Sequence, residues 1–309
     1  MAFSGSKDFG VTRSELLLAA MRKIGTFDAG DEPAADEIAH AAFSLNVIVK
    51  NLAVKGVHIS LRETVTVFLQ PSQQSYQIGP GGDNATSSYV ETTLSAAAAA
   101  AATTVSLTSY AGMTNGDYIG IKLDDNTIHW TTIVDRTVTT ITTGLASAAA
   151  SGARVYTYTT KANRPHRLVW AHRRDSSGYD SEVTLIGDIA YRSLSNKAAS
   201  GPVNQAFYQP TLTTGTLFVW PVDGGASVDK LMLVAEPMAD DMDAAGNNPQ
   251  FPIEAVLPLI YAVAADLAPE AGIGIRERRE LRDQARELME DWLNDSVENA
   301  SVVFGMDAS

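Results

Sequence analysis

The stretch "ETTLSAAAAAAATTVSLTSYAGMTNGDYIGIKL" at residues 91–123 decides how the chain divides into parts. Residues 96–102 are an unbroken run of alanine, the strongest helix former, but a free-standing helix is marginal below about 12 residues. The run lies among Thr, Val, Gly and Asn residues, which are typical of short strands and turns. We therefore interpret it as an entry strand or a small-residue packing segment, with residues 145–155 as its counterpart near the exit.

Short β runs follow the alanine stretch. Asn115-Gly116 and Asp125-Asn126 separate them and have the turn chemistry of hairpins. Residues 91–160 are therefore predicted to form a small inserted all-β module, barrel-like or sandwich-like. The predicted strands are residues 103–107, 117–123, 128–134, 138–143 and 154–160.

Helices are predicted at the start of the chain. Thr12 and Glu15 form a capping box, and apolar residues at helical spacing follow as far as Gly25. A second amphipathic helix opens at residues 31–33, where two acidic residues precede a proline. We expect these two helices to pack as an antiparallel hairpin.

Helices are also predicted at the end of the chain. Residues 252–272 form a helix that begins or kinks at Pro258, and residues 275–297 form an amphipathic helix with a mixed-charge face. Before them, residues 217–222 and 230–236 predict a hairpin across a Gly-rich turn.

The predicted fold class is α+β. The N- and C-terminal helices form a bundle packed beside a β-sheet region, and this core consists of residues 1–90 and 161–309. The β module of residues 91–160 is inserted into it.

Composition excludes several classes of protein. The 309 residues include no cysteine, which excludes disulfides and cysteine-based zinc or iron–sulfur sites. We expect no signal peptide and no membrane partner, because no window approaches the roughly 18 apolar residues of a membrane span. The net charge of −13 argues against general nucleic-acid binding but leaves room for a local basic patch.

No motif predicts chemistry. The histidines lack zincin spacing, although the even separation of His166 and His172 allows one strand face to carry both. Asp124-Asp125 is read as a hairpin turn in preference to a calcium site. We predict no catalytic, cofactor-binding or metal-binding residues, and a protein that is not an enzyme.

A basic cluster lies at residues 161–174. Its positive charges suit either the phosphates of DNA or an acidic protein partner. The alternative is an ordinary solvated strand end, and both interpretations stay open. The candidate contact residues are Lys161, Arg164, Arg167, Arg173 and Arg174.

Two later segments carry a resemblance to a known family. The first, residues 191–222, contains "LSNKAASGPVNQAFY" at residues 194–208 and "GTLFVWP" at residues 215–221. The second, residues 231–272, contains an acidic loop that leads to a helix ending in "LAPEAG". In this order they resemble the head-to-tail adaptor proteins of tailed phages, especially short-tailed ones, which include tail accessory factors. The inserted β module also looks like modules of phage structural proteins.

The resemblance implies a ring, commonly of twelve copies, that docks under the portal protein while packaged double-stranded DNA passes through its centre. A tail tube or nozzle protein would attach on the opposite side. The protein would be made in the bacterial cytoplasm and reside in the virion at the head–tail junction. The C-terminal segment would reach the portal through Glu298, Val302, Val303, Phe304 and Met306.

Two other classes of function stay open. A tail, baseplate or decoration protein would use the β insert to bind a host surface or another virion protein. A cell-wall hydrolase would need two carboxylates roughly 5–10 Å apart in a cleft, which sequence spacing does not reveal.

Overall fold

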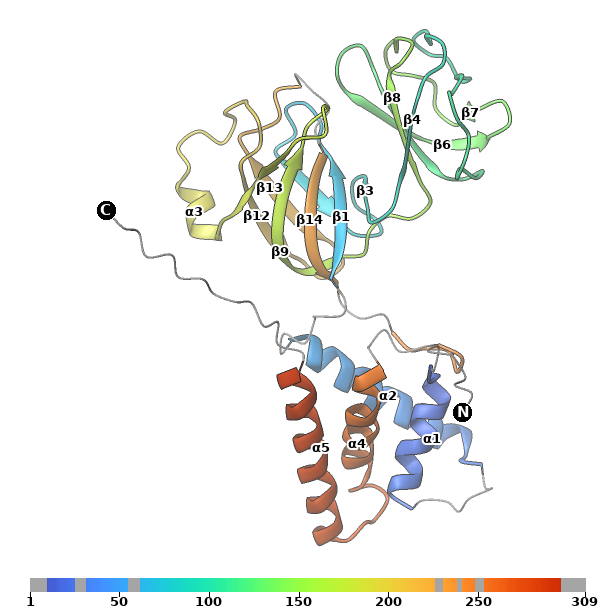
Figure 1. Cartoon of the computed structure of the whole chain (residues 1–309), viewed down its shortest axis with the longest axis vertical. Coiled ribbons are helices and arrows are strands. Elements are labelled where there is room, and N and C mark those ends of the chain that lie inside the picture. The colour runs from blue at the N-terminus through green and yellow to red at the C-terminus, as the bar shows by residue number, and fades with distance from the viewer. Residues whose placement is uncertain are drawn as a thin grey trace, which may run out of the picture. The chain divides into compact units, whose positions relative to one another are not determined.

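The computed structural model describes residues 10–25, 32–54, 62–225, 230–237, 241–247 and 253–295. The chain forms two compact units: Met1–Leu61 together with Met238–Ser309, and Arg62–Pro237. The first unit is helical, whereas the second consists mainly of strands (Figure 1). The predicted α+β class is confirmed. The predicted boundaries at 90/91 and 160/161 stay a prediction, since the two compact units divide at 61/62 and 237/238.

The helical unit is built from both ends of the chain. One core joins Leu16 of α1, Leu45 of α2, Leu259 of α4 and Trp292 of α5. Burial of this shared apolar surface, more than helix propensity, stabilises the unit. Its elements are α1 (Arg13–Lys23), α2 (Ala35–Val54), the 3₁₀ turn η1 (Ile253–Ala255), α4 (Val256–Leu267) and α5 (Ile275–Asp295).

Local signals set the helix starts. The predicted capping box is confirmed: the Thr12 side chain accepts a hydrogen bond from the Glu15 amide, and the Glu15 carboxylate accepts one from the Thr12 amide. α2 begins at Ala35, a few residues later than predicted. Pro258 lies in the first turn of α4, where a missing amide hydrogen breaks no helical hydrogen bond.

The second unit contains two sheets that share a core. A five-stranded sheet has the order β10-β9-β14-β1-β3, and a four-stranded sheet has the order β11-β12-β13-β2. Val65 and Leu233 of the first sheet pack in one cluster with Leu217 of the second, which gives a sandwich-like arrangement. The strands are β1 (Glu63–Phe68), β2 (Ser75–Ile78), β3 (Ala85–Thr86), β9 (Pro165–Arg174), β10 (Asp180–Glu182), β11 (Thr184–Leu185), β12 (Gln205–Pro210), β13 (Gly215–Trp220) and β14 (Lys230–Pro237), with the short helix α3 (Asp188–Ser193).

The predicted hairpin between residues 217–222 and 230–236 is wrong. β13 pairs with β12 and β2, whereas β14 pairs with β1 and β9 in the other sheet. The chain leaving β13 is already hydrogen-bonded to residues 199–201, because the Val222 amide donates to Ala199 and the Val222 carbonyl accepts from Gly201. The chain after β13 therefore does not fold back on that strand, and β14 pairs in the five-stranded sheet.

A third sheet lies between β3 and β9 in sequence and has its own core around Ile119, Ile121 and Val155. Its order is β4-β8-β5-β6-β7, and no barrel closes among the described strands. Predicted strand 103–107 is instead a segment with isolated bridges. The strands are β4 (Val90–Thr93), β5 (Tyr118–Lys122), β6 (Ile128–Asp135), β7 (Thr140–Ile141) and β8 (Arg154–Tyr158).

The alanine run packs against its predicted counterpart. Ala98 and Ala149 exchange both backbone hydrogen bonds, of 2.8 and 2.9 Å. Further along, the Ala101 amide donates to the Leu145 carbonyl and the Leu145 amide to the Ala102 carbonyl. The run is therefore not helical: Ala98 forms an isolated bridge, and residues 99–102 form a turn in which Ala101 has a φ of 62°. Small side chains allow the two segments to lie close together.

Aromatic residues join this third sheet to the sandwich. Phe68, at the end of β1, is 2% exposed and lies 4.8 Å from the Tyr156 ring and 5.0 Å from the Trp130 ring, measured between centroids. Beside it, the Gln70 side chain donates to the Ile128 carbonyl at 2.8 Å and accepts from the Ile128 amide at 2.9 Å. Packing and paired hydrogen bonds therefore fix the orientation of the third sheet on the sandwich.

Replacing Phe68 with alanine should remove this contact. We expect Phe68→Ala to lower the free energy of unfolding by about 3–5 kcal/mol, because a buried ring is lost and a cavity remains. Urea denaturation measures the change. The matched control is Phe43→Ala, at a side chain that is 67% exposed, and equal losses in both variants would contradict the assignment.

Candidate functional site

Strand β9 carries most of the predicted basic cluster. Arg167, Arg173 and Arg174 lie on β9, Arg164 immediately precedes it, and Lys161 lies in the connection from β8. Because neighbouring residues of a strand face opposite sides of a sheet, Arg173 and Arg174 diverge. The five residues therefore do not form a single patch.

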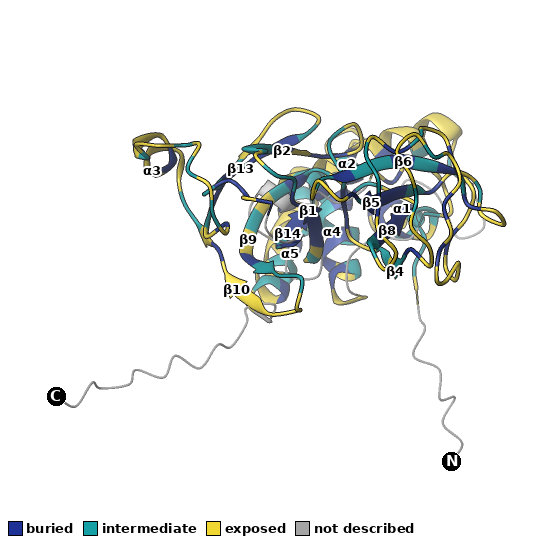
Figure 2. Ribbon diagram, turned by 90° about the horizontal axis from the view of Figure 1, so that it is seen from above, coloured by how far each residue is buried: buried dark blue, intermediate teal, exposed yellow. Residues whose placement is uncertain are grey.

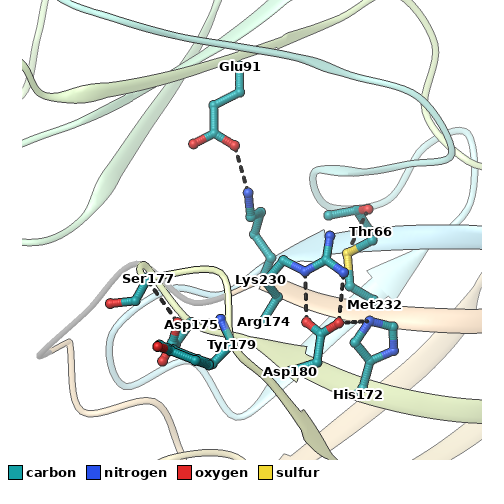
Figure 3. A network of polar contacts seen from close by, with 10 residues as sticks. All are labelled: Thr66, Glu91, His172, Arg174, Asp175, Ser177, Tyr179, Asp180, Lys230 and Met232. Carbon is teal, nitrogen blue, oxygen red and sulfur yellow. Dashed lines mark hydrogen bonds and ion pairs between the residues drawn. The ribbon is translucent and has the colours of Figure 1, made fainter.

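Arg174 is paired within the fold. Its guanidinium donates two hydrogen bonds to the Asp180 carboxylate on β10, of 2.7 and 2.8 Å (Figure 3). This bidentate contact lowers the pKa of Asp180 below its ordinary value and raises that of Arg174. All three residues of β10 are exposed (Figure 2), so the pair forms the edge of the five-stranded sheet.

Arg167 is paired with a buried carboxylate. Glu236, directly across from it on β14, is 1% exposed and accepts hydrogen bonds from Arg167 and from Arg62, the latter at 3.2 Å. The hydrogen bond with Glu236 raises the pKa of Arg167. Two guanidinium groups thus compensate one buried negative charge, which would otherwise be costly.

Lys161 also has contacts inside the protein. Its ammonium group donates to the Gly82 carbonyl and lies 5.2 Å from the centre of the Tyr118 ring. Arg164 and Arg173 each make a contact within the chain as well. These contacts favour a structural part for the cluster, and its contact with DNA or a partner stays a prediction.

His172 occupies the same sheet face as Arg174. It is 8% exposed, its Nε2 lies 3.6 Å from an Asp180 oxygen, and its ring lies 4.7 Å from that of Trp170. Burial lowers the pKa of His172, and Arg174 adds to the effect while Asp180 opposes it. Burial therefore favours the neutral form of this imidazole.

The even separation of His166 and His172 allows a shared strand face only if side chains alternate strictly along the strand. The register of β9 against β14 shifts twice, so that neither Val169 nor His166 has a partner on β14. Such bulges interrupt the alternation of side chains. The even separation of the two histidines therefore does not place them on one face.

A buried lysine connects the third sheet to the sandwich. Lys230 of β14 is 4% exposed, donates to Glu91 of β4 at 2.7 Å, and lies over the rings of Tyr89 and Tyr156. Burial alone would lower the pKa of Lys230, but hydrogen bonds with Glu91 and Tyr89 outweigh it and raise the pKa. Arg154 donates to the other Glu91 oxygen at 2.7 Å, which completes the compensation. Sequence reasoning missed this network, because 139 residues separate Lys230 from Glu91.

The segments "LSNKAASGPVNQAFY" at residues 194–208 and "GTLFVWP" at residues 215–221 meet in one corner of the sandwich. The Trp220 indole donates to the Asn196 carbonyl at 2.8 Å, and the Gln74 side chain donates to the Lys197 carbonyl at 2.6 Å. Lys197 in turn donates to the carbonyls of Arg192 and Leu194 at the end of α3, each at 3.0 Å. The motif residues thus bind one another and position α3.

An aromatic stack lies beside this corner. Tyr191 of α3 packs on Phe207 of β12 and Phe218 of β13, with ring centroids 5.2–5.7 Å apart. These contacts are typical of a structural element that holds a short helix against a sheet.

The remaining predictions concern the C-terminal contact residues, metal and membrane sites, and the turn at Asp125. Glu298, Val302, Val303, Phe304 and Met306 lie outside the described residues. Among the residues that the structure describes, no three His, Asp or Glu side chains group as metal ligands would. Within the same residues, every helix is too short or too polar to cross a membrane. Asp125 forms the predicted turn between β5 and β6, where it accepts hydrogen bonds from the Thr127 amide and hydroxyl that lower its pKa.

No family model matches the chain, and no curated protein sequence matches it significantly.

Replacing Arg167 with alanine distinguishes a structural part from a DNA contact. We expect Arg167→Ala to lower the free energy of unfolding by about 1–3 kcal/mol, because Glu236 stays buried with one partner fewer. Denaturation and retention of double-stranded DNA would be measured on the same samples. Arg192→Ala, at an exposed arginine of α3, is the control. Loss of DNA retention with unchanged stability would show that Arg167 contacts DNA.

Acidification should destabilise the protein through His172. An unfolded histidine has a pKa near 6.5, whereas folded His172 binds its proton less readily, so stability falls as the pH drops below that value. We expect His172→Gln to reduce the loss of melting temperature between pH 7.5 and pH 5.5. His129→Gln controls for removing an imidazole, and an unchanged pH profile in His172→Gln would refute the assignment.

Proposed function

We propose that the chain is a non-enzymatic structural protein of a tailed-phage virion. In this proposal it is a subunit of the adaptor ring beneath the portal, and packaged DNA passes through the ring. The observation that carries the proposal is the corner in which the "LSNKAASG" and "LFVWP" segments bind each other through Asn196 and Trp220. The segments that resemble adaptor proteins thus have a structural part, positioning α3, and they hold no reactive group.

The helical unit supports a protein that assembles with neighbours. Phe43 and Val47, one turn apart on α2, are 67% and 50% exposed. Large apolar side chains that share a helix face and remain uncovered suit an interface. In the proposed ring, commonly of twelve copies, helical units would contact one another, and portal and tail tube or nozzle proteins would bind opposite sides.

The charge of the chain suits a DNA channel. A net charge of −13 per copy repels phosphates over most of a ring's inner surface, so DNA slides through without being held. The described cations of the basic cluster are largely paired internally, which is consistent with this proposal.

Native mass spectrometry of the protein, alone and with the portal protein encoded near it, tests the proposal. We expect a ring of defined stoichiometry, formed alone or on the portal. A chain truncated after Val297 should fold but fail to join the portal, because it lacks the predicted contact residues from Glu298 onward. Circular dichroism would confirm that the truncated chain is folded.

Two outcomes would contradict parts of this proposal. Unchanged portal affinity of the truncated chain would exclude the C-terminal segment as the portal contact. A full-length chain that does not bind the portal but binds host cells would support a tail or decoration protein instead. The separate core of the third sheet, around Ile119 and Val155, favours that second candidate as a recognition module.

A further inference from the structure

An open pocket of about 420 Å³ lies in the helical unit. It is bounded by the end of α1, the first turns of α2 and the turn that follows α4. Its floor is apolar, and acidic side chains form its rim. Met21, Ile24 and Leu267 are buried and form the floor, whereas Ala271 and the rim residues Asp36, Glu37, His40 and Glu270 are exposed.

The rim is acidic and partly fixed in place. Glu37 accepts a hydrogen bond from the Ala34 amide at 3.0 Å, and Glu270 lies 3.3 Å from His40. Among the residues that the structure describes, no lysine or arginine lines the pocket. An apolar floor under an acidic rim suits an arginine side chain, whose stem packs on apolar groups while its guanidinium binds carboxylates.

Helix α5 presents such side chains. Ile275, Arg279, Arg282 and Arg286 follow one another at i, i+4, i+7 and i+11, so they form one stripe along the helix. All four are exposed, and Ile275 is 72% exposed. Neither Arg279 nor Arg282 has an ion-pair partner among the described residues, whereas Arg286 lies 3.8 Å from Glu290.

The pocket and the stripe belong to the same end of the helical unit but do not meet within one chain. α5 contributes no residue to the pocket, and it packs on α4. Only residues 272–274 separate Ala271, which lines the pocket, from Ile275, the first residue of α5. Complementary surfaces at different places on one subunit form a head-to-tail contact, which closes into a ring when the rotation allows.

We propose that the Arg279–Arg282 stripe of one copy docks into the acidic pocket of the next copy. This inference rests on the proposed function, since it names the contact through which copies of the chain form the ring. The exposed charges make the contact sensitive to salt.

A charge exchange tests the contact. Arg279→Glu with Arg282→Glu, and separately Asp36→Lys with Glu270→Lys, should each abolish assembly, because like charges then face one another. Mixing the two variants should restore assembly with alternating subunits, since both kinds of contact are again complementary. A chain with all four substitutions should also assemble by itself. Native mass spectrometry and sedimentation, alone and on the portal, measure the assembly.

The control is Arg276→Glu, at a residue on another side of α5 whose side chain is 91% exposed. It should assemble like the unmodified chain. Two results would overturn the docking inference but not the adaptor proposal. One is unchanged assembly of both double variants on the portal, and the other is a mixture of the two variants that fails to assemble. An unmodified chain that stays monomeric alone and with the portal would overturn both.

Discussion

The antiparallel pairing of β1 with β14 is the constraint on which the rest of the architecture depends. Glu63 lies opposite Ala235, and the ladder continues to Phe68 opposite Lys230. The first and last residues of the strand-rich unit are thereby neighbours, although most of the chain lies between them. The two ends of the chain can form one helical unit because this strand pair brings the end of the strand-rich unit next to its beginning.

The third sheet also begins and ends with an antiparallel strand pair. Val90 of β4 lies opposite Thr157 of β8, so the entry and exit of this module are also neighbours. The Ala162 amide then donates to the Ala85 carbonyl at 2.8 Å, which resumes pairing with the sandwich. Each level of insertion is closed by an antiparallel pair, and Phe68 and Lys230 at the end of the β1–β14 ladder hold the module against it.

Local and distant interactions differ in how well sequence predicts them. The capping box of Thr12 and the turn at Asp125 were predictable, because the interacting groups lie within three residues of each other. The similar composition of the alanine run and residues 145–155 identified them as counterparts, but only the structure shows that they pair. The partners of β13 and β14 were not predictable. The same alternation of apolar and polar residues is compatible with a local hairpin and with strands in two separate sheets. The two bulges of β9 could not be predicted either, because the spacing of residues in the sequence does not indicate them.

The distribution of cations connects the fold to assembly. In the described residues, Arg167 and Arg174 compensate carboxylates of the sandwich, and Lys230 compensates Glu91 at the joint with the third sheet. These positive charges form ion pairs within a single chain. An acidic chain that associates with its own copies needs cations that its own fold leaves without a partner. Among the described residues of α5, Arg279 and Arg282 meet that condition. In the proposed ring, charge that folding leaves unpaired, more than total charge, decides which surfaces of the chain contact the next copy.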